Sequence, residues 1–143
     1  MNHRILIAAL VASLSFACGD DEDDTNPTTA GIEVAGTWTS SFGGDVVITD
    51  TTWTDMVAQK VVKFDNTKNS VITLTPATVP EGYTPNVFSR TLWTETVAGV
   101  TNVCTVDFNL ATQAEAEAST TTANANDLDK GCGGFGWTKL TKK

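Results

Sequence analysis

Few side chains in this sequence could carry out chemistry, and the three cysteines and the single histidine are the first to consider. The histidine is His3, and it lies in an N-terminal segment that is typical of a cleaved signal peptide. Histidine serves in many nucleophilic triads, as a common general base and in most transition-metal sites. Because the mature chain would contain none, we predict that the protein is not an enzyme.

Carboxylates and glycines offer three further possibilities for chemistry, and the sequence disfavours each. Glu115 and Glu117 could pair as in a glycosidase, but on a helix they would point to different sides, as a solvated face does. The acidic and amide side chains of 124–129 could offer oxygen ligands to Ca²⁺, but their spacing is not that of an EF-hand loop. The glycines of 131–134 lack the Lys-Ser/Thr partner of a phosphate-binding loop. We predict no catalytic residue, no metal site and no cofactor.

Cys18 stands between an apolar leader and an acidic run, and this position indicates a lipid anchor. Residues 2–4 are polar or basic and 5–17 are mostly apolar, a stretch shorter than the about 20 residues of a membrane-spanning helix. The preceding Leu-Ser-Phe-Ala resembles the lipobox of bacterial lipoproteins, with its leucine four residues before the cysteine rather than three. We predict a signal peptide over 1–17 and lipidation of Cys18. An ordinary secretory signal cut near Ala17 is the alternative.

Residues 18–30 are predicted to be a lipidated acidic tether. The acidic run at 20–24 is followed by small polar residues and a proline, and like charges extend such a segment. The run also resembles the sorting signals of some surface-exposed lipoproteins. We expect the protein in the bacterial cell envelope, anchored to the outer membrane through Cys18, with periplasmic and surface orientations both open. The formal net charge of −8 and the lack of a basic stripe argue against a nucleic-acid partner.

Cys104 and Cys132 remain as an even pair once Cys18 carries the lipid. In an exported, oxidising compartment such a pair is expected to form a disulfide. Two free thiols or a metal pair are the alternatives, and no nearby histidine or further cysteine could complete a zinc site. We predict that the two residues are disulfide-bonded.

Residues 31–143 are predicted to form a single, mainly β domain. β-Branched and aromatic residues are frequent, and apolar and polar residues alternate with a period of two. A small antiparallel barrel or strongly curled sheet of seven or eight strands would follow, because closure protects strand edges. Cys104, Val106 and Phe108 are expected to share one strand face. The predicted strands lie at 34–42, 46–48, 62–64, 72–74, 88–93, 100–108 and 135–140.

Two stretches depart from this alternation. Residues 76–85 hold three prolines and a glycine, which predicts a connecting loop. Residues 110–118 are rich in alanine and glutamate, and Thr112 and Glu115 fit a capping box. We predict one short helix near 110–118. The residues at helical spacing in this segment are Leu110, Ala114 and Ala118.

Gly36-Thr37-Trp38 looks like the Gly-x-Trp that opens lipocalin-like (calycin) barrels. In that family the tryptophan closes the base of the barrel and packs against a basic side chain near the last strand. The resemblance implies this role for Trp38, with Lys139 standing in for the family's usual arginine, which is absent here. A core tryptophan on an edge strand is the alternative.

A second resemblance covers most of the domain. Cys104, 111–116 and the Gly-Cys-Gly-Gly-Phe-x-Trp-Thr-Lys-Leu end at 131–140 are similar to a group of small bacterial exported lipoproteins that also share the Gly-Thr-Trp start. No established activity comes with that group. The resemblance therefore supports one domain and a disulfide, and it carries over no catalytic residue.

Two functions fit these observations best. The first is a non-catalytic envelope lipoprotein whose β domain is an interaction or binding module for an unknown protein. The alternative is a carrier of a small apolar ligand with a lipocalin-like cavity, for which no binding residue can be assigned from sequence. The four tryptophans could stack on sugars or clamp an apolar ligand, although tryptophan in a small β domain is more often core, and Trp53 is the least regularly placed. A lined cavity would favour the carrier, and a filled core with an exposed apolar patch would favour a protein partner.

Overall fold

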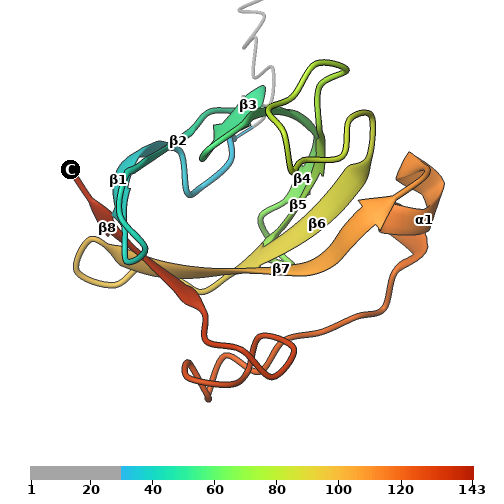
Figure 1. The fold of residues 1–143 in the computed structure, drawn as a ribbon. Helices are drawn as coiled ribbons and strands as arrows, with labels where there is room; N and C mark the ends of the chain where they lie inside the picture. Colours follow the sequence, from blue (N-terminus) through green and yellow to red (C-terminus); the bar gives the residue numbers. More distant parts are fainter. Residues whose placement is uncertain (1–29) are drawn as a thin grey trace, which may run out of the picture.

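The computed structural model describes residues 30–143, which form a closed antiparallel barrel of eight strands with one short helix (Figure 1). The predicted mainly β fold is thereby confirmed. The predicted signal peptide, Cys18 and all of the tether except Ala30 lie outside the described residues. The strands are β1 Gly36–Ser40, β2 Asp45–Ile48, β3 Thr52–Thr54, β4 Ala58–Asp65, β5 Ser70–Leu74, β6 Phe88–Trp93, β7 Val100–Leu110 and β8 Thr138–Lys142, and the helix is α1 Gln113–Ala118.

The barrel is an up-and-down meander in which each strand pairs with the next one along the chain. β8 closes the ring by pairing with both β7 and β1, with Thr39 opposite Thr141. Tight turns such as Ala98-Gly99 make this order possible, because both residues have positive φ, at 50° and 74°, as two-residue hairpin turns require. Closure leaves few unpaired strand edges, which the sequence argument anticipated.

One strand was missed by the sequence prediction, and another begins later than predicted. β3, with Trp53 at its centre, was not expected from the sequence. It directly follows a threonine-rich turn, in which the Thr49 hydroxyl accepts hydrogen bonds from the Thr51 and Thr52 amides. The short strand is therefore difficult to distinguish from this turn in the sequence. The last strand begins at Thr138 rather than at 135, because the preceding residues belong to a loop, where the Trp137 amide donates to the Leu128 carbonyl.

The helix is shorter than predicted, and its buried face is different. β7 continues to Leu110, so α1 begins only at Gln113. The predicted capping box is present: Thr112 accepts a hydrogen bond from the Glu115 amide, and the Glu115 carboxylate accepts one from the Thr112 amide. Ala116, rather than the expected set at helical spacing, is the buried residue of the helix. It packs α1 on the outside of β5, β6 and β7, beyond one end of the barrel.

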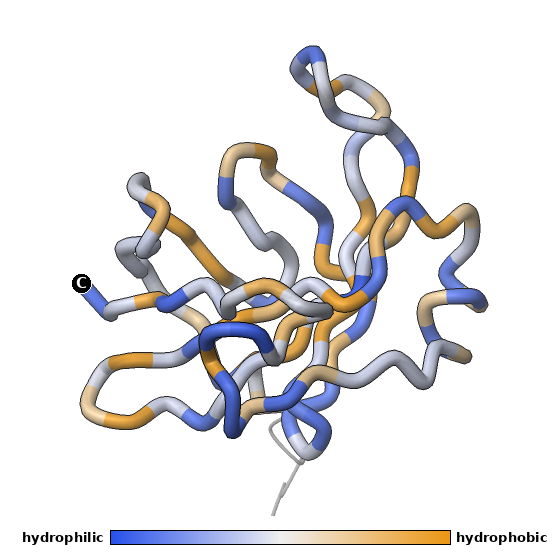
Figure 2. Tube along the Cα trace, turned by 60° about the horizontal axis from the view of Figure 1, so that its bottom comes forward, coloured by the Kyte–Doolittle hydropathy of each residue, from blue (hydrophilic) through white to orange (hydrophobic). Residues whose placement is uncertain are grey.

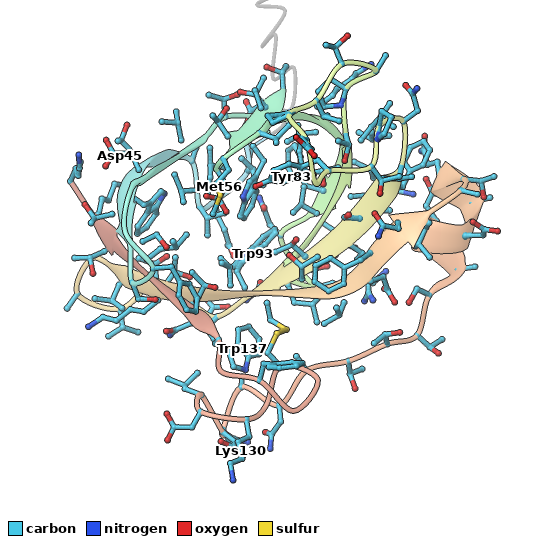
Figure 3. The ribbon with its side chains drawn as sticks, in the orientation of Figure 1. Asp45, Met56, Tyr83, Trp93, Lys130 and Trp137 are labelled. Atoms are coloured by element: carbon cyan, nitrogen blue, oxygen red, sulfur yellow. A yellow bond between two sulfur atoms is a disulfide. The ribbon has the colours of Figure 1, made fainter. Side chains whose placement is uncertain are left out.

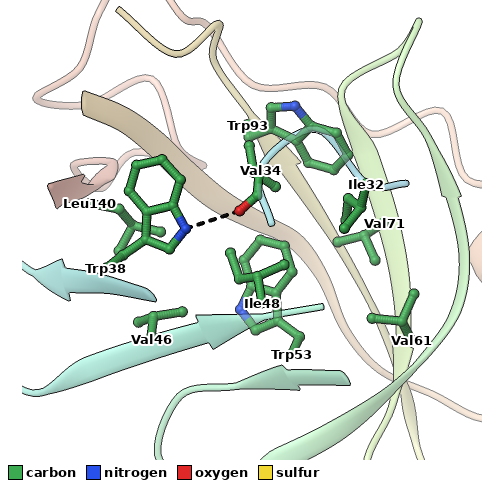
Figure 4. Close-up of a cluster of buried hydrophobic side chains, with 10 residues drawn as sticks. All are labelled: Ile32, Val34, Trp38, Val46, Ile48, Trp53, Val61, Val71, Trp93 and Leu140. Atoms are coloured by element: carbon green, nitrogen blue, oxygen red, sulfur yellow. Dashed lines mark hydrogen bonds between the residues drawn. The ribbon is translucent and has the colours of Figure 1, made fainter. Parts of the chain in front are cut away.

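An apolar core fills one part of the barrel (Figure 4). Trp38 is 1% exposed, and its indole N–H donates to the Val34 carbonyl at 2.9 Å. The ammonium of Lys142 lies 5.4 Å from the centre of the Trp38 ring. The basic partner of this tryptophan is therefore Lys142 and not Lys139, because Lys142 pairs directly with Trp38 across β1 and β8. The core residues are Ile32, Val34, Trp38, Val46, Ile48, Trp53, Val61, Val71, Trp93 and Leu140.

Hydrophobic residues occur in short stretches that polar residues interrupt along the chain (Figure 2). Within residues 30–143 the structure contains no helix whose length and apolarity would suit it to crossing a membrane.

The segment between α1 and β8 runs outside the barrel and is fastened to β7. The sulfur atoms of Cys104 and Cys132 lie 2.01 Å apart, the distance of a disulfide, as predicted for this pair. Trp137 is buried beside this loop and donates its indole N–H to the Asn124 carbonyl (Figure 3). Gly131 is required by close packing, since an added Cβ would lie 2.0 Å from the Asn124 carbonyl oxygen.

Candidate functional site

The interior of the barrel changes from apolar to hydroxyl-bearing along its strands. Side chains of a strand alternate between the two faces, so every second residue points inward. On β5 the inward residues run from Val71 to Thr73, and on β6 they run from Trp93 through Thr91 to Ser89. Because neighbouring strands are antiparallel, the hydroxyls of the two strands meet at the same end of the barrel. The core residues Val71 and Trp93 therefore lie at one end, and a polar wall lies at the other.

This polar end contains a cavity of about 240 Å³. Its walls come from the sheet on both sides and from the loop between β5 and β6. Thr73 and Thr91 are only 3% and 7% exposed, so hydroxyls take positions that an apolar residue would occupy in a filled barrel. The lining residues are Trp53, Asp55, Gln59, Thr73, Thr75, Tyr83, Thr84, Ser89, Thr91, Thr105, Phe108 and Asn109.

Two hydrogen bonds between side chains fix part of the polar wall. The Thr73 hydroxyl donates to the Gln59 side-chain oxygen at 2.6 Å. The hydroxyls of Thr91 and Thr105, opposite each other on β6 and β7, lie 2.9 Å apart. These bonds hold four polar side chains in defined orientations, so the wall is formed before any ligand arrives.

Other polar groups of the wall have no protein partner among residues 30–143. The hydroxyls of Thr75 and Ser89 make no hydrogen bond to a described side chain or backbone group, and neither does the Gln59 amide nitrogen. No fully inaccessible side-chain nitrogen or oxygen of this part of the chain lacks a partner. The free groups are therefore open to the cavity, where a bound molecule or water can reach them.

The rim of the cavity is aromatic and apolar. Tyr83, in the loop between β5 and β6, donates its hydroxyl to the sulfur of Met56 at 3.1 Å, and Figure 3 shows the two side chains beside each other. Met56 and Phe108 are 77% and 64% exposed. The loop is anchored at both ends, because the Thr75 amide donates to the Val87 carbonyl at 2.9 Å. The rim is therefore held in place by the sheet on either side.

Charge is sparse at this site. Asp55, which is exposed, is the one charged residue among the described residues that line the cavity. Among residues 30–143, the two carboxyls with shifted pKa values lie elsewhere, on the outer surface. A hydrogen bond from Thr67 lowers the pKa of Asp65, and bonds from Gln113 and then Lys63 lower the pKa of Glu117. The wall thus presents neutral donors and acceptors.

No protein-family model, curated protein or solved structure matches this chain.

Three of the carboxylates considered for chemistry have structural roles. Glu115 completes the helix cap, and Glu117 forms an ion pair with Lys63 at 3.2 Å. Asp127 accepts hydrogen bonds from the Asp129 and Lys130 amides within its own turn. Among residues 30–143 there is no cluster of three or more His, Cys, Asp or Glu side chains that could hold a metal ion.

The four tryptophans are all buried, so none forms an exposed sugar-stacking or clamping pair. Trp53 alone among them borders the cavity, at 7% exposure. The threonines of the wall were not singled out by the sequence argument. The available signal was the change from valine to threonine at successive alternate positions of 71–75.

A second, more open groove of about 420 Å³ lies on the outside of β7. Its floor contains the Cys104–Cys132 pair, and its edges carry Phe108 and Phe135, which are 64% and 78% exposed. Phe108 was expected on the face of Cys104, and the two residues line this same outer groove together with Val106. The pairing register of β7 with β6 shifts twice between Thr105 and Leu110, and Phe108 also lines the barrel cavity.

Proposed function

We propose that the chain is a lipoprotein of the bacterial envelope, anchored to the outer membrane through lipidated Cys18, and that its barrel is a non-catalytic binding module for a small ligand. The observation that carries the proposal is the hydroxyl-lined cavity at one end of a closed barrel. The earlier alternative, a small-ligand carrier, is thereby preferred to a module for a protein partner. The ligand differs from the apolar one first considered, because the wall is polar.

The energetics of the interior support a binding role. Burying hydroxyls in a barrel is unfavourable unless they are hydrogen-bonded. Thr73 is hydrogen-bonded to Gln59, and Thr91 is hydrogen-bonded to Thr105. Thr75 and Ser89 have no described protein partner for their hydroxyls. An apolar residue at these positions would have extended the core. A ligand that reaches the wall would give these two hydroxyls partners.

The size of the cavity limits the ligand. An apolar cavity of about 150 Å³ is large enough to bind benzene. At about 240 Å³ this cavity has room for one six-membered ring with several substituents. Pockets for drug-sized ligands measure about 300–1,000 Å³. A single ring, or the terminal ring of a longer molecule that protrudes from the rim, fits best.

The anchor is tested by Cys18→Ala. The variant is expected to lose the mass of its acyl chains and its place in the membrane fraction, since two or three chains are needed for stable attachment. Fractionation and intact-mass measurement give both results. Thr25→Ala, in the same tether, should stay lipidated and membrane-bound. A Cys18→Ala protein that remains in the membrane fraction shows that the lipoprotein assignment is wrong.

The binding module is tested by native mass spectrometry of the protein purified from its own envelope. A mass above that of the lipidated chain is expected, and it should disappear in Ser89→Phe. Ser89 lies beside Thr73 on the neighbouring strand and lines the cavity, so a phenyl ring there would fill part of the space. Thr96→Phe, in an exposed turn, is the matched control and should keep the added mass. Equal loss or equal retention in both variants argues against the cavity as the site.

The outer groove gives a specific reason for a second candidate function, the binding of a protein partner. Phe108 and Phe135 are large apolar side chains left exposed on one surface. A protein that co-purifies with the wild type and with Ser89→Phe, but not with Phe135→Ser, would favour this second function over the first.

A further inference from the structure

We propose that the ligand of the barrel cavity is a neutral pyranose ring, either free or at the end of a glycan. This inference rests on the proposed function, because it names the chemical class that the same cavity would bind. It follows from three properties of the wall: its hydroxyls, its lack of positive charge, and its aromatic border.

The first property is the number of neutral donors and acceptors. A hydroxyl can donate one hydrogen bond and accept two, so it can bond to another hydroxyl in either direction. Thr75 and Ser89 are free of described protein partners, and the Gln59 amide nitrogen is free while its oxygen accepts from Thr73. A ring that carries several hydroxyls satisfies such a wall. An apolar ring of the same size would leave these groups without partners.

The second property is the charge. Among the described residues that line the cavity there is no lysine, arginine or histidine. A carboxylate or phosphate placed against the threonines would lose its hydration without a positive partner. Asp55 is negative and exposed, so it would further oppose an anion. The wall therefore favours a neutral ligand over an acidic one.

The third property is the aromatic border. Trp53 forms part of the wall, and Tyr83 and Phe108 stand at the rim. An aromatic ring has a negative face that attracts the positively polarised C–H groups of a sugar. A lining that combines hydroxyls with aromatic rings matches the two kinds of surface of a pyranose, whose edges are hydroxylated and whose faces carry C–H groups.

The test is a titration of the full-length chain, purified from the membranes of an expressing bacterium and held in phosphocholine micelles. Four probes are compared by amide and indole NMR shifts: methyl glucoside, methyl N-acetylglucosaminide, glucuronate and cyclohexylmethanol. The first two are neutral sugars, the third adds a carboxylate, and the fourth keeps a ring of the same size without its row of hydroxyls. With probe at about 50 mM, even a Kd of about 10 mM gives more than half saturation.

The expected result is saturable shifts at Trp53, Thr75 and Ser89 with at least one neutral sugar and none with glucuronate or cyclohexylmethanol. Binding of glucuronate or cyclohexylmethanol in the cavity without binding of either sugar overturns the ligand class but leaves the proposed binding module standing. Absence of shifts with every probe also overturns the ligand class. The proposed function is judged separately by the native mass measurement on Ser89→Phe.

A pair of double variants ties binding to the wall. Thr91→Val with Thr105→Val removes two cavity hydroxyls that bond only to each other among the described groups, so neither is left unpaired. The double variant should fold and should bind the sugar at least about tenfold more weakly. Thr39→Val with Thr141→Val changes another cross-strand pair, on the outer surface, and should bind as the wild type does. Unchanged affinity in Thr91→Val with Thr105→Val contradicts the proposal.

Discussion

Replacing Trp38 by alanine is expected to lower the free energy of unfolding by about 3–5 kcal/mol, the range for a large aromatic residue removed from a core. Trp38 is 1% exposed and lies among the core residues of β1 and its neighbours. Its loss would leave a cavity and an unpaired Val34 carbonyl, which now accepts from the indole at 2.9 Å. Since domains are stable by about 5–15 kcal/mol, the change would remove a large part of the total.

Urea denaturation of the full chain, with and without the substitution, measures this loss. Two controls separate the contributions. Trp38→Phe keeps most of the apolar volume and should lower the free energy of unfolding clearly less than Trp38→Ala does. Lys142→Met keeps the aliphatic stem that packs on the ring and removes the charge that lies 5.4 Å from the ring centre. The second change should cost about 0.5–1 kcal/mol. A loss below about 1 kcal/mol for Trp38→Ala would show that Trp38 does not organise the core.

Removing the Cys104–Cys132 disulfide is expected to lower stability by about 3–4 kcal/mol. The two residues are 28 positions apart, and in the chain-entropy model a crosslink of this length restricts the unfolded chain by that amount. The suitable change is Cys104→Ala together with Cys132→Ala, because a single substitution would leave a reactive thiol. Thermal or urea unfolding in non-reducing buffer gives the difference.

The same double variant should keep the ligand-binding cavity. Neither cysteine lines it, and the barrel is closed by the pairing of β8 with β7 and β1 rather than by the crosslink. We expect a lower unfolding midpoint with unchanged ligand affinity. Adding reductant to the wild type should reproduce the shift, and adding it to the double variant should not. Equal stability of the two proteins would mean that the pair does not crosslink the chain in solution.

The β alternation made most of the barrel predictable. Local signals also located the capping box of Thr112 and Glu115, because it depends on residues close together in the chain. The errors arose where distant contacts override local pattern. Phe135 reads as part of a strand, but the loop that includes Leu128 and Trp137 holds this segment away from the sheet.

The cavity could not be located from sequence, because it depends on register. A threonine on a strand faces solvent or interior according to its pairing, and a shift by one position reverses the two. Thr91 and Thr105 are both inward-facing because they stand opposite each other on β6 and β7. Sequence shows that both are threonines, but only the folded barrel shows that they share a wall with Thr73. The partner of Trp38 depended on register in the same way, since Lys142 and not Lys139 lies opposite it.

A crystal structure of the protein purified from its own envelope would show whether the hydroxyl-lined end of the barrel holds a small ligand. The prediction is electron density for a ring-sized molecule inside the cavity, within hydrogen-bond distance of Thr75, Ser89 or Gln59. A cavity that contains only water, in a crystal whose co-purified molecule lies elsewhere on the protein, would show that this cavity is not the ligand-binding site.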